Sequence, residues 1–313
     1  MIDAQTKLVG VMGWPIAHSL SPAMHNAAFD ALGLNWRYVA FPVHPRDVGR
    51  AIDGLVALGF YGTNVTVPHK EAVIPHLDEI PDRVRRFGAV NTIIVCRSAD
   101  AERDTSTLGS DAEAGCTPES ACTLKGENTD VEGFIYALRQ GGFDPHGKRV
   151  LVVGAGGGAR GVVYWLCGAG AGEVVVLNRT AERAERLVAD LLAHPCDTNL
   201  TWGALTPQAL ARQADASELL VNTTTVGMWP RADASIWPDD VFIPAHLAVC
   251  DLVYRPLETR LLRQAKEAGA MAIDGLGMLV AQGVLSFQMW TGQWPPEDIM
   301  RAACEAALES RSQ

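Results

Sequence analysis

The chain alternates between short apolar runs and longer stretches with apolar positions on one side, which predicts an α/β fold. Strands are expected at 7–13, 36–41, 62–67, 89–95, 149–153, 173–177, near 200, and at 218–221, 247–252 and 271–273. Helices are expected at 23–32, 45–59, 71–87, 131–140, 162–167, 181–192, 257–268, 278–290 and 296–307. Strands separated by helices are typical of sheets whose faces are covered by helices.

One strand, turn and helix in the second half carry a glycine-rich sequence, Gly154-Ala155-Gly156-Gly157-Gly158. Gly154 allows a tight turn, and Gly156 lets the backbone approach a pyrophosphate that rests on the amide groups of the helix N-terminus. Ala159 stands at the third position of this fingerprint, where helix and strand pack closely. The pattern indicates a dinucleotide-binding unit, and a glycine turn with a purely structural role is the alternative.

The end of the next strand, Asn178-Arg179-Thr180, indicates which dinucleotide is bound. A site for NAD usually has Asp or Glu here to bind the ribose 2′-hydroxyl, and that carboxylate would repel the 2′-phosphate of NADP. The guanidinium groups of Arg179 and Arg183 are suited to bind a phosphate, so we expect NADP. Alternatively, both arginines are solvated residues at a helix start, although cations are disfavoured there.

Composition and charge limit the class of protein. A chain of 313 residues can hold two domains, and 48% hydrophobic with 20% charged residues is typical of a globular protein. The net charge of −10 argues against nucleic-acid binding, and no apolar run is long enough to span a membrane. Seven cysteines without a Cys-x-x-Cys pair, and no signal-peptide pattern, predict reduced thiols in the cytoplasm. Neither cysteines nor histidines have metal-ligand spacing, so no metal is expected.

The segment 97–127 differs from its surroundings. It contains no aromatic residue, no Ile and no Val, and it is rich in Asp, Glu, Ser, Thr and Ala. Such a composition cannot bury enough apolar surface to form a core. We therefore expect a mobile surface insertion rather than a domain.

Polar side chains gather at predicted strand ends in the first half of the chain. They are Ser19, Ser21, Asn64, Thr66, Lys70, Asn91 and Thr92. Loops at strand ends are where α/β folds place ligands, and this set suits a small polyhydroxylated substrate. Each residue could instead serve only as a cap or turn residue. Ser21 in particular is expected as a helix N-cap, with Pro22 at the first helical position.

Eight motifs follow one another over nearly the whole chain. They are Ser19-Leu20-Ser21-Pro22, Asn64-Val65-Thr66-Val67-Pro68-His69-Lys70, Gly88-Ala89-Val90-Asn91-Thr92, Asn128-Thr129-Asp130, Gly154 to Arg160, Asn178-Arg179-Thr180, Asn222 to Met228, and Asp274 to Gly283. Together and in this order they resemble the shikimate dehydrogenase family. The main departure is the insertion at 97–127, where members of the family usually have a short hairpin.

The resemblance implies an architecture of two α/β domains. A substrate-binding domain at 1–127 is completed by C-terminal helices at 275–313, and a Rossmann domain occupies 128–274. It also implies the activity, which is reversible NADP-dependent reduction of 3-dehydroshikimate to shikimate in chorismate and aromatic amino-acid biosynthesis. The partner implied is this small-molecule substrate, and the protein is expected to be a monomer or a homodimer.

The resemblance further implies roles for single residues. Reduction of a ketone by hydride needs a proton donor at the developing alkoxide. Lys70 is expected to be the general acid, with Asp130 orienting the hydroxyl and holding the lysine. The substrate-binding residues implied are Ser19, Ser21, Thr66, Asn91, Asp130, Tyr254 and Gln282, with the two serines at the carboxylate. The cofactor-binding residues implied are Gly154, Ala155, Gly156, Gly157, Gly158, Asn178, Arg179, Thr180, Arg183, Leu252 and Gly275.

Other interpretations of these residues stay open. Lys70 is otherwise a solvated lysine, and Asp130 is otherwise an N-cap. An NAD-dependent quinate/shikimate dehydrogenase is an alternative, against which the serine pair and Asn178-Arg179-Thr180 argue. A non-catalytic nucleotide-binding relative is another, and it predicts loss of Lys70 or Asp130, both of which are present.

Overall fold

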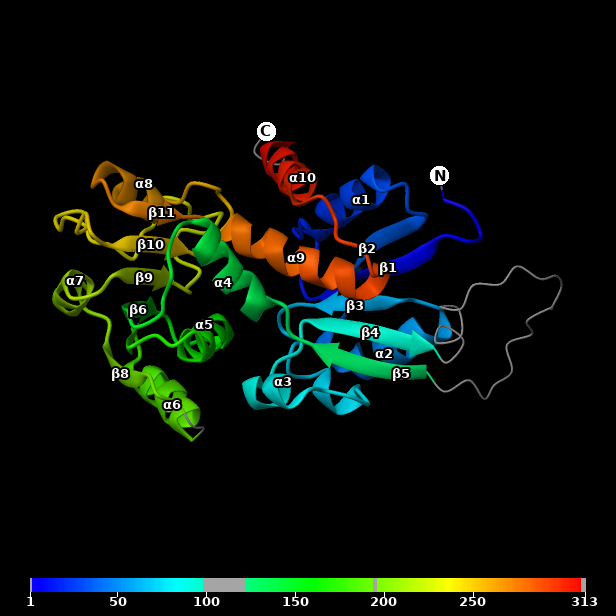
Figure 1. Ribbon diagram of the computed structural model, residues 1–313, viewed down its shortest axis with the longest axis horizontal. Coiled ribbons are helices and arrows are strands. Elements are labelled where there is room, and N and C mark those ends of the chain that lie inside the picture. The colour runs from blue at the N-terminus through cyan, green and yellow to red at the C-terminus, as the bar shows by residue number, and fades with distance from the viewer. Residues whose placement is uncertain (1, 98–121, 194–195, 311–313) are drawn as a thin grey trace. The chain divides into compact units, whose positions relative to one another are not determined.

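The computed structural model describes residues 2–97, 122–193 and 196–310 of the chain, whose elements are labelled in Figure 1. The chain divides into two compact units. The first contains Met1–Thr129 and Gly283–Cys304, and the second contains Asp130–Gln282 and Glu305–Gln313. Each unit consists of a sheet with helices packed on it, so the predicted fold class is confirmed.

The first unit is built on a five-stranded sheet in the order β2-β1-β3-β4-β5. Its strands are β1 (Lys7–Gly13), β2 (Trp36–Pro42), β3 (Gly62–Val65), β4 (Thr92–Arg97) and β5 (Cys122–Glu127). β1 pairs parallel with β2 and β3, whereas β4 and β5 are added antiparallel. Because β2 and β3 flank β1, the carboxyl ends of β1 and β3 form a topological switch point, where open α/β sheets bind ligands.

Helices from both ends of the chain cover this sheet (Figure 1). They are α1 (Ser21–Ala31), η1 (Pro45–Asp47), α2 (Val48–Ala57), η2 (Ile74–His76), α3 (Asp82–Phe87), the second half of α9 (Gly275–Thr291) and most of α10 (Glu297–Ser310). Ile52 of α2 and Val84 of α3 share a core with Val65 of β3. An aromatic cluster joins α1 to α9, where the Phe29 and Phe287 rings stack with centroids 4.8 Å apart.

The second unit has a six-stranded sheet in the order β11-β10-β9-β6-β7-β8, with every pairing parallel. Its strands are β6 (Arg149–Val153), β7 (Glu173–Asn178), β8 (Asn199–Ala204), β9 (Leu219–Asn222), β10 (Ala248–Asp251) and β11 (Met271–Ile273). Counted from the first strand of the unit, this is the Rossmann order 3-2-1-4-5-6. Its switch point lies between β6 and β9.

Helices also cover both faces of the second sheet. They are α4 (Asp130–Gln140), α5 (Gly157–Gly168) and α6 (Ala181–Leu192) on one face, and α7 (Pro207–Asp215) and α8 (Arg260–Glu267) on the other. Val150 and Val152 of β6 pack with the first set, whereas Leu151 and Val153 pack with the second. Successive strand residues point to opposite faces, so a sheet buried on both sides needs the continuous apolar run seen in β6.

Two sequence predictions about local structure in the first unit are wrong. The helix expected at 71–87 is broken into turns, η2 and α3, because Pro75 and Pro81 lack the N–H that a continuous helix needs. Ser21 is not the N-cap of α1. Leu20 occupies that position, and Ser21 is the first helical residue.

The segment expected to be an insertion, 97–127, is partly regular structure. Cys122–Glu127 forms β5 and pairs with β4 along its whole length. Its buried positions alternate, with Leu124 and Gly126 inward, which the polar composition conceals. Residues 98–121 lie outside the described part of the chain, so the expectation of a mobile loop there stays a prediction.

Several features can be assessed over residues 2–97, 122–193 and 196–310. No helix in these ranges has both the length and the apolar character that a membrane crossing requires. They contain no group of three or more His, Cys, Asp or Glu side chains placed to hold a metal ion. The cysteines described are free thiols: Cys96, Cys122, Cys167, Cys196, Cys250 and Cys304.

Candidate functional site

The carboxyl ends of β1 and β3 bring several predicted substrate residues together in the first unit. The loop after β1 carries Ser19 and leads to Ser21, the first residue of α1, and the turn after β3 carries Thr66 and Lys70. The Thr66 backbone N–H donates to the Met12 carbonyl at 3.0 Å, so the turn is tied to the end of β1. Ser21 is only 7% exposed, whereas the other three are half-buried.

A buried network of amides and hydroxyls lies beside this sheet edge. Asn64 Nδ2 donates to the Asn91 carbonyl at 3.2 Å and to Thr92 Oγ1 at 3.1 Å. Asn91 Nδ2 donates to Thr129 Oγ1 at 3.0 Å, and Asn91 Oδ1 accepts from the Thr129 backbone N–H at 2.7 Å. None of the four residues is more than 5% exposed. Because buried polar groups must satisfy one another, these bonds fix the orientation of each side chain.

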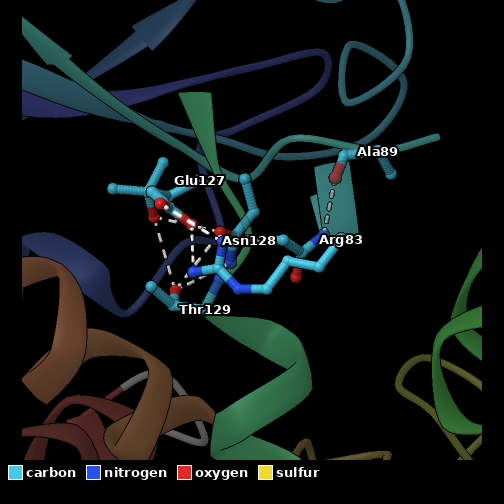
Figure 2. Close-up of polar contacts among 7 residues, drawn as sticks. Arg83, Ala89, Glu127, Asn128 and Thr129 are labelled. Carbon is cyan, nitrogen blue, oxygen red and sulfur yellow. Dashed lines mark hydrogen bonds and ion pairs between the residues drawn. The ribbon is translucent and has the colours of Figure 1, made fainter. Parts of the chain in front are cut away.

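Figure 2 shows the adjoining chain where β5 runs into α4. Arg83 Nη2 donates to Glu127 Oε2 at 2.7 Å, and Asn128 Nδ2 donates to the Ala89 carbonyl at 2.8 Å. The Asn91 backbone N–H donates to the Glu127 carbonyl at 3.0 Å. The motifs around Asn91 and Asn128, far apart in the sequence, therefore form one structure.

Lys70 is held to the same structure through its backbone. Its carbonyl accepts from the Val90 N–H at 2.9 Å. The preceding residue, His69, is 1% exposed, and its Nε2 lies 2.7 Å from the Val43 carbonyl. Since a carbonyl only accepts, Nε2 carries the hydrogen and donates it. The bond to the Lys70 carbonyl and the bond of the neighbouring His69 ring thus hold the backbone at the predicted catalytic lysine. Lys70 itself is half-buried.

Two more hydrogen bonds near this sheet edge were not indicated by the motifs. The Ser21 backbone N–H donates to Ser19 Oγ at 3.3 Å. The hydroxyl of Tyr38, in β2, donates to Asn64 Oδ1 at 2.7 Å. Burial raises the pKa of Tyr38 well above its ordinary value, so this hydroxyl keeps its proton. Tyr38 therefore joins β2 to the buried network.

In the second unit, the glycine-rich turn has the backbone that a dinucleotide phosphate requires. Gly154 has a φ of +122°, and an added Cβ there would lie 2.3 Å from Thr223 Oγ1. A Cβ at Gly156 or Gly157 would meet nothing within 4 Å, so the backbone at the start of α5 is open to a ligand. A helix N-terminus offers unpaired N–H groups and partial positive charge. These residues fit the pyrophosphate of a dinucleotide.

The end of β7 places the four residues predicted for the adenosine phosphate around the start of α6. Asn178 Nδ2 donates to the Thr180 carbonyl at 2.8 Å and closes the turn between strand and helix. Arg179 and Arg183 are both exposed. Two exposed guanidinium groups at the end of the second strand of a dinucleotide-binding unit fit the 2′-phosphate of NADP.

The structure brings Leu252 and Gly275 together. An added Cβ at Gly275 would lie 2.6 Å from the Leu252 carbonyl, so the position requires glycine. Beside them, the buried Asp251 carboxylate accepts from Asn222 Nδ2 at 2.9 Å and from Thr259 Oγ1 at 2.7 Å. Burial raises the pKa of Asp251, and these hydrogen bonds act in the opposite direction. The carboxylate ties the ends of β9 and β10 together.

The remaining predicted site residues also belong to the second unit. Asp130 begins α4, and Gly133 of that helix packs so closely that an added Cβ would lie 2.9 Å from the Gln282 backbone nitrogen. Gln282 is 7% exposed, and Tyr254 is half-buried in the loop after β10. The start of α4 and Gln282 are therefore neighbours. Lys70 belongs to the first unit, so its pairing with Asp130 stays a prediction.

Several polar residues of these clusters were not among the predicted site residues. They are Tyr38, Asn128, Thr129, Asn222 and Asp251. Most of them stand inside the eight motifs, so the sequence already indicated that these positions belong to a site. Tyr38 and Asp251 gave less indication, because a single polar group in an apolar strand is also compatible with a satisfied core residue.

Three family models match successive parts of the chain. The model described as "Shikimate dehydrogenase substrate binding domain" matches residues 11–93. The model described as "Shikimate / quinate 5-dehydrogenase" matches residues 137–202, which include the glycine-rich turn. The model described as "Shikimate 5'-dehydrogenase C-terminal domain" matches residues 275–305.

Known proteins are similar to this chain over nearly its full length. The shikimate dehydrogenase (NADP(+)) of Moorella thermoacetica is 43% identical over 99% of this chain and 97% of its own. A crystal structure of shikimate dehydrogenase in complex with NADP+ has a TM-score of 0.82 at 36% identity and covers 98% of both chains. The shikimate 5-dehydrogenase of Thermus thermophilus, in complex with NADP(H) and shikimate, has a TM-score of 0.78 at 36% identity and covers 96% of this chain and 99% of its own.

The Rossmann sheet, its glycine-rich turn and the accompanying α/β unit define an oxidoreductase of the dinucleotide-dependent class. The sequence identity to shikimate dehydrogenases over nearly the full length of the chain narrows this class to one family. The chain belongs to the shikimate dehydrogenase family, as its motifs indicated.

Proposed function

We propose that this protein is an NADP-dependent shikimate dehydrogenase, which reversibly reduces 3-dehydroshikimate to shikimate in chorismate and aromatic amino-acid biosynthesis. Relatives named shikimate dehydrogenase (NADP(+)) at 43% and 42% identity support this activity and cofactor. An NAD-dependent quinate dehydrogenase is not favoured. The proposed binding site for the adenosine half of the cofactor contains Arg179, and Asn178 stands where an NAD site would have a carboxylate. A non-catalytic relative is not favoured either, since Lys70 and Asp130 are present.

One observation carries the proposal for the substrate site. Motifs from three separate stretches of the chain, around Asn64, Asn91 and Thr129, converge in one buried network whose members accept from and donate to each other. The backbone of Lys70 is bonded to the same loop, at Val90. A preformed polar network, in a loop bonded to the backbone of a half-buried lysine, suits a small hydroxylated carbonyl compound.

The second unit supplies residues suited to NADP. When bound, this cofactor supplies the hydride for reduction of the ketone. We infer that the backbone from Gly154 through Gly158 holds the pyrophosphate at the start of α5. Arg179 and Arg183, with Asn178 and Thr180, bind the adenosine phosphate. Leu252 and Gly275, which pack together, line the nicotinamide.

Lys70 is the proposed general acid. Reduction of a ketone places negative charge on its oxygen, and the ammonium group of Lys70 gives that oxygen a proton to form the alcohol. In oxidation, the neutral amine takes the proton back. Asp130 orients the hydroxyl and holds the lysine.

The other proposed contacts divide by the chemistry of the substrate. Ser19 and Ser21 donate to the carboxylate, and Thr66 and Asn91 bind hydroxyl groups. The contacts from the second unit are Tyr254 and Gln282. We assign the substrate to a domain of residues 1–127 and 275–313, and the cofactor to a domain of residues 128–274.

Removal of the Lys70 amine tests the mechanism. We expect Lys70→Ala to lower kcat for shikimate oxidation by roughly 10²–10⁴-fold, the usual contribution of a positioned general acid or base. The Kd for NADP+ should stay within about twofold, since Lys70 is not part of the cofactor site. Initial rates and cofactor titration measure the two quantities.

Lys125→Ala is the matched control. Lys125 lies on β5 of the same unit, and its ammonium pairs with Glu79 at 3.0 Å on the surface. This variant should keep the turnover of the unaltered protein. Near-normal turnover of Lys70→Ala would contradict the assignment of Lys70, and equal losses in both variants would indicate an effect on folding rather than on catalysis.

A further inference from the structure

Asp251, at the end of β10, is a carboxylate that is buried without a cation beside it. The residue is 0% exposed. Within the described part of the chain its hydrogen-bond partners are all neutral, and it forms no ion pair with a Lys, Arg or His side chain. Buried charges in proteins are normally paired with a cation or bound to a metal, and the described residues hold no metal cluster. This charge therefore needs an explanation other than an ion pair within the protein.

The hydrogen bonds at both oxygens of Asp251 favour the charged carboxylate. Oδ1 accepts from Asn222 Nδ2 at 2.9 Å and from the Val253 N–H at 3.1 Å, and Oδ2 accepts from the Thr259 hydroxyl at 2.7 Å. Asn222 must present its amino group to Asp251, because Asn222 Oδ1 accepts from the Thr224 N–H at 3.0 Å. Donors of this kind favour the ionised form and oppose the effect of burial. They supply hydrogen bonds but no positive charge.

Asp251 stands in a row of residues across the carboxyl edge of the second sheet. It pairs with Asn222 of β9, and Asn222 pairs with Val153 of β6, the residue before the glycine-rich turn. In the proposed function this turn binds the pyrophosphate, and the end of β7 binds the adenosine phosphate. A Rossmann sheet binds the two halves of a dinucleotide on either side of its switch point. The nicotinamide half therefore belongs to the side of β9 and β10, where Asp251 lies.

The residues proposed to line the nicotinamide are in contact with Asp251. Leu252 follows it directly in the chain, and an added Cβ at Gly275 would lie 2.8 Å from the Asp251 carbonyl oxygen. The oxidised nicotinamide ring carries one positive charge, whereas the reduced ring is neutral. A fixed negative charge in a buried position acts on a nearby cation more strongly than the same charge in water. It therefore distinguishes the oxidised from the reduced cofactor.

We propose that the buried charge of Asp251 determines a preference for the oxidised cofactor: it favours binding of NADP+ over NADPH at the nicotinamide end of the site. Asp251 acts through its charge rather than by contact with the cofactor. The oxidised ring provides the opposite charge that the described protein residues do not provide. The inference rests on the proposed function, in which Leu252 and Gly275 line the nicotinamide.

Asp251→Asn removes the charge and keeps the size of the side chain. The new amide can accept from Asn222 Nδ2 and the Val253 N–H, and it can donate to the Thr259 hydroxyl oxygen. The Kd values for NADP+ and for NADPH are measured by titration of the full chain without substrate. We expect the ratio of Kd for NADP+ to Kd for NADPH to rise at least about fivefold, because only the oxidised ring loses an attraction between opposite charges.

Asp215→Asn is the matched control, because it makes the same change of charge in the same unit. Asp215 is exposed at the end of α7, shortly before β9 and so toward the amino edge of the sheet. Its ratio of Kd values should equal that of the unaltered protein. Adenosine 2′,5′-bisphosphate has the 2′-phosphate but no nicotinamide. Its Kd should change by less than about twofold in Asp251→Asn, which shows that the variant is folded and that its adenosine site is intact.

Each outcome for Asp251→Asn supports or overturns the proposal. An unchanged ratio of Kd values would overturn it, and so would an equal change of the ratio in Asp215→Asn. If Asp251→Asn does not bind adenosine 2′,5′-bisphosphate, Asp251→Ser removes the same charge with a smaller side chain, and the ratio is measured on that variant. Loss of adenosine 2′,5′-bisphosphate binding in both variants would show that the carboxylate serves the fold alone, and the proposal would be wrong.

Failure of the proposed function gives a different result, because the Kd values do not depend on turnover. A protein that binds NADP+ and NADPH but does not oxidise shikimate would contradict the proposed function, and the ratio of Kd values would still test Asp251. Oxidation of shikimate with an unchanged ratio in Asp251→Asn would overturn the proposal for Asp251 alone.

Discussion

Arg179 is exposed directly after β7 and follows Asn178, the position where a carboxylate would favour NAD. A guanidinium group and a phosphate form charge-assisted hydrogen bonds, which only the 2′-phosphate of NADP can provide. We expect Arg179→Ala to raise the Kd for NADP+ by roughly tenfold or more and to leave the Kd for NAD+ nearly unchanged. Titration with the two cofactors measures the difference.

The control for Arg179 is an arginine of the helix that follows it, α6. Arg186 is exposed on α6, one turn beyond Arg183, and Arg186→Ala removes the same charge from the unit. This variant should change the Kd for NADP+ and the Kd for NAD+ only slightly and by the same factor. Equal weakening of NADP+ and NAD+ by Arg179→Ala would refute a contact with the 2′-phosphate.

His25 is a buried histidine whose ring nitrogens have no hydrogen-bond partner among the described residues. Its ring is 0% exposed and lies among the rings of Phe29, Tyr38, Phe287 and Trp290. Burial lowers the pKa of His25 from 6.5 to about 3, because a charged imidazole loses its hydration there. The folded protein therefore keeps His25 neutral down to low pH.

This lowered pKa makes stability depend on pH. Between about pH 6.5 and pH 3 the unfolded chain binds a proton at His25 that the folded protein does not, so the free energy of unfolding falls as the pH falls. His25→Phe removes this contribution and keeps the stacking. From pH 7 to pH 5, we expect the unaltered protein to lose about 2 kcal/mol more than His25→Phe in urea unfolding.

Substitution of an exposed histidine distinguishes the contribution of His25 from the loss of stability that the rest of the protein shows at low pH. His246 is exposed, and His246→Phe should lose stability between pH 7 and pH 5 as the unaltered protein does. If His25→Phe showed the same loss as His246→Phe, a charged His25 would be tolerated in the folded protein, and the account of its burial would be wrong.

The strand, turn and helix from Arg149 to Gly168 make a prediction at the scale of the element. Gly154→Ala places a Cβ 2.3 Å from Thr223 Oγ1 and a side chain at φ +122°. We expect this variant to lose roughly 1–3 kcal/mol of unfolding free energy, together with cofactor binding. Gly156→Ala meets no atom within 4 Å, so it should keep its stability and weaken only NADP+ binding, where the cofactor approaches the backbone.

Urea unfolding and cofactor titration of both variants test whether the effects on stability and on NADP+ affinity are separate. The expected pattern is a loss of stability in Gly154→Ala alone and a weaker NADP+ affinity in both. A stable Gly154→Ala would show that the turn tolerates a side chain despite its conformation. Unaltered NADP+ affinity in Gly156→Ala would place the pyrophosphate elsewhere.

The elements that the sequence predicted well are those buried on both sides. β6 and β7 are continuous apolar runs with turn residues after them, so both the apolar pattern and the turn chemistry pointed to the same structure. The segment 71–87 was misjudged because Val73, Leu77 and Val84 have helical spacing, whereas Pro75 and Pro81 prevent a continuous helix.

Polar elements were harder to predict. α7 was not expected, because Leu210 and Ala214 are its only buried residues among those described, although Thr206 is an N-cap that accepts from the Ala209 N–H at 3.1 Å. β5 was concealed in a polar segment, and its antiparallel pairing depends on β4 rather than on its own residues. Apolar periodicity reports burial, so elements with little buried surface give a weak pattern.

At the scale of the whole chain, the order of the motifs predicted the family and much of the candidate site. The loops after β1 and β3 could be placed at one sheet edge, since the carboxyl ends of parallel strands meet there. Sequence could not indicate that the Tyr38 hydroxyl bonds to Asn64, because that bond depends on how β2 and β3 are registered against β1. Such contacts join residues whose spacing in the sequence carries no pattern.

The central claim is the activity, and four initial rates test it most directly. Oxidation of shikimate and of quinate would be measured with NADP+ and with NAD+ on one purified preparation of the full chain. We predict activity mainly with shikimate and NADP+, because Arg179 and Arg183 favour the 2′-phosphate. Faster oxidation of quinate, or faster reaction with NAD+ than with NADP+, would contradict this claim.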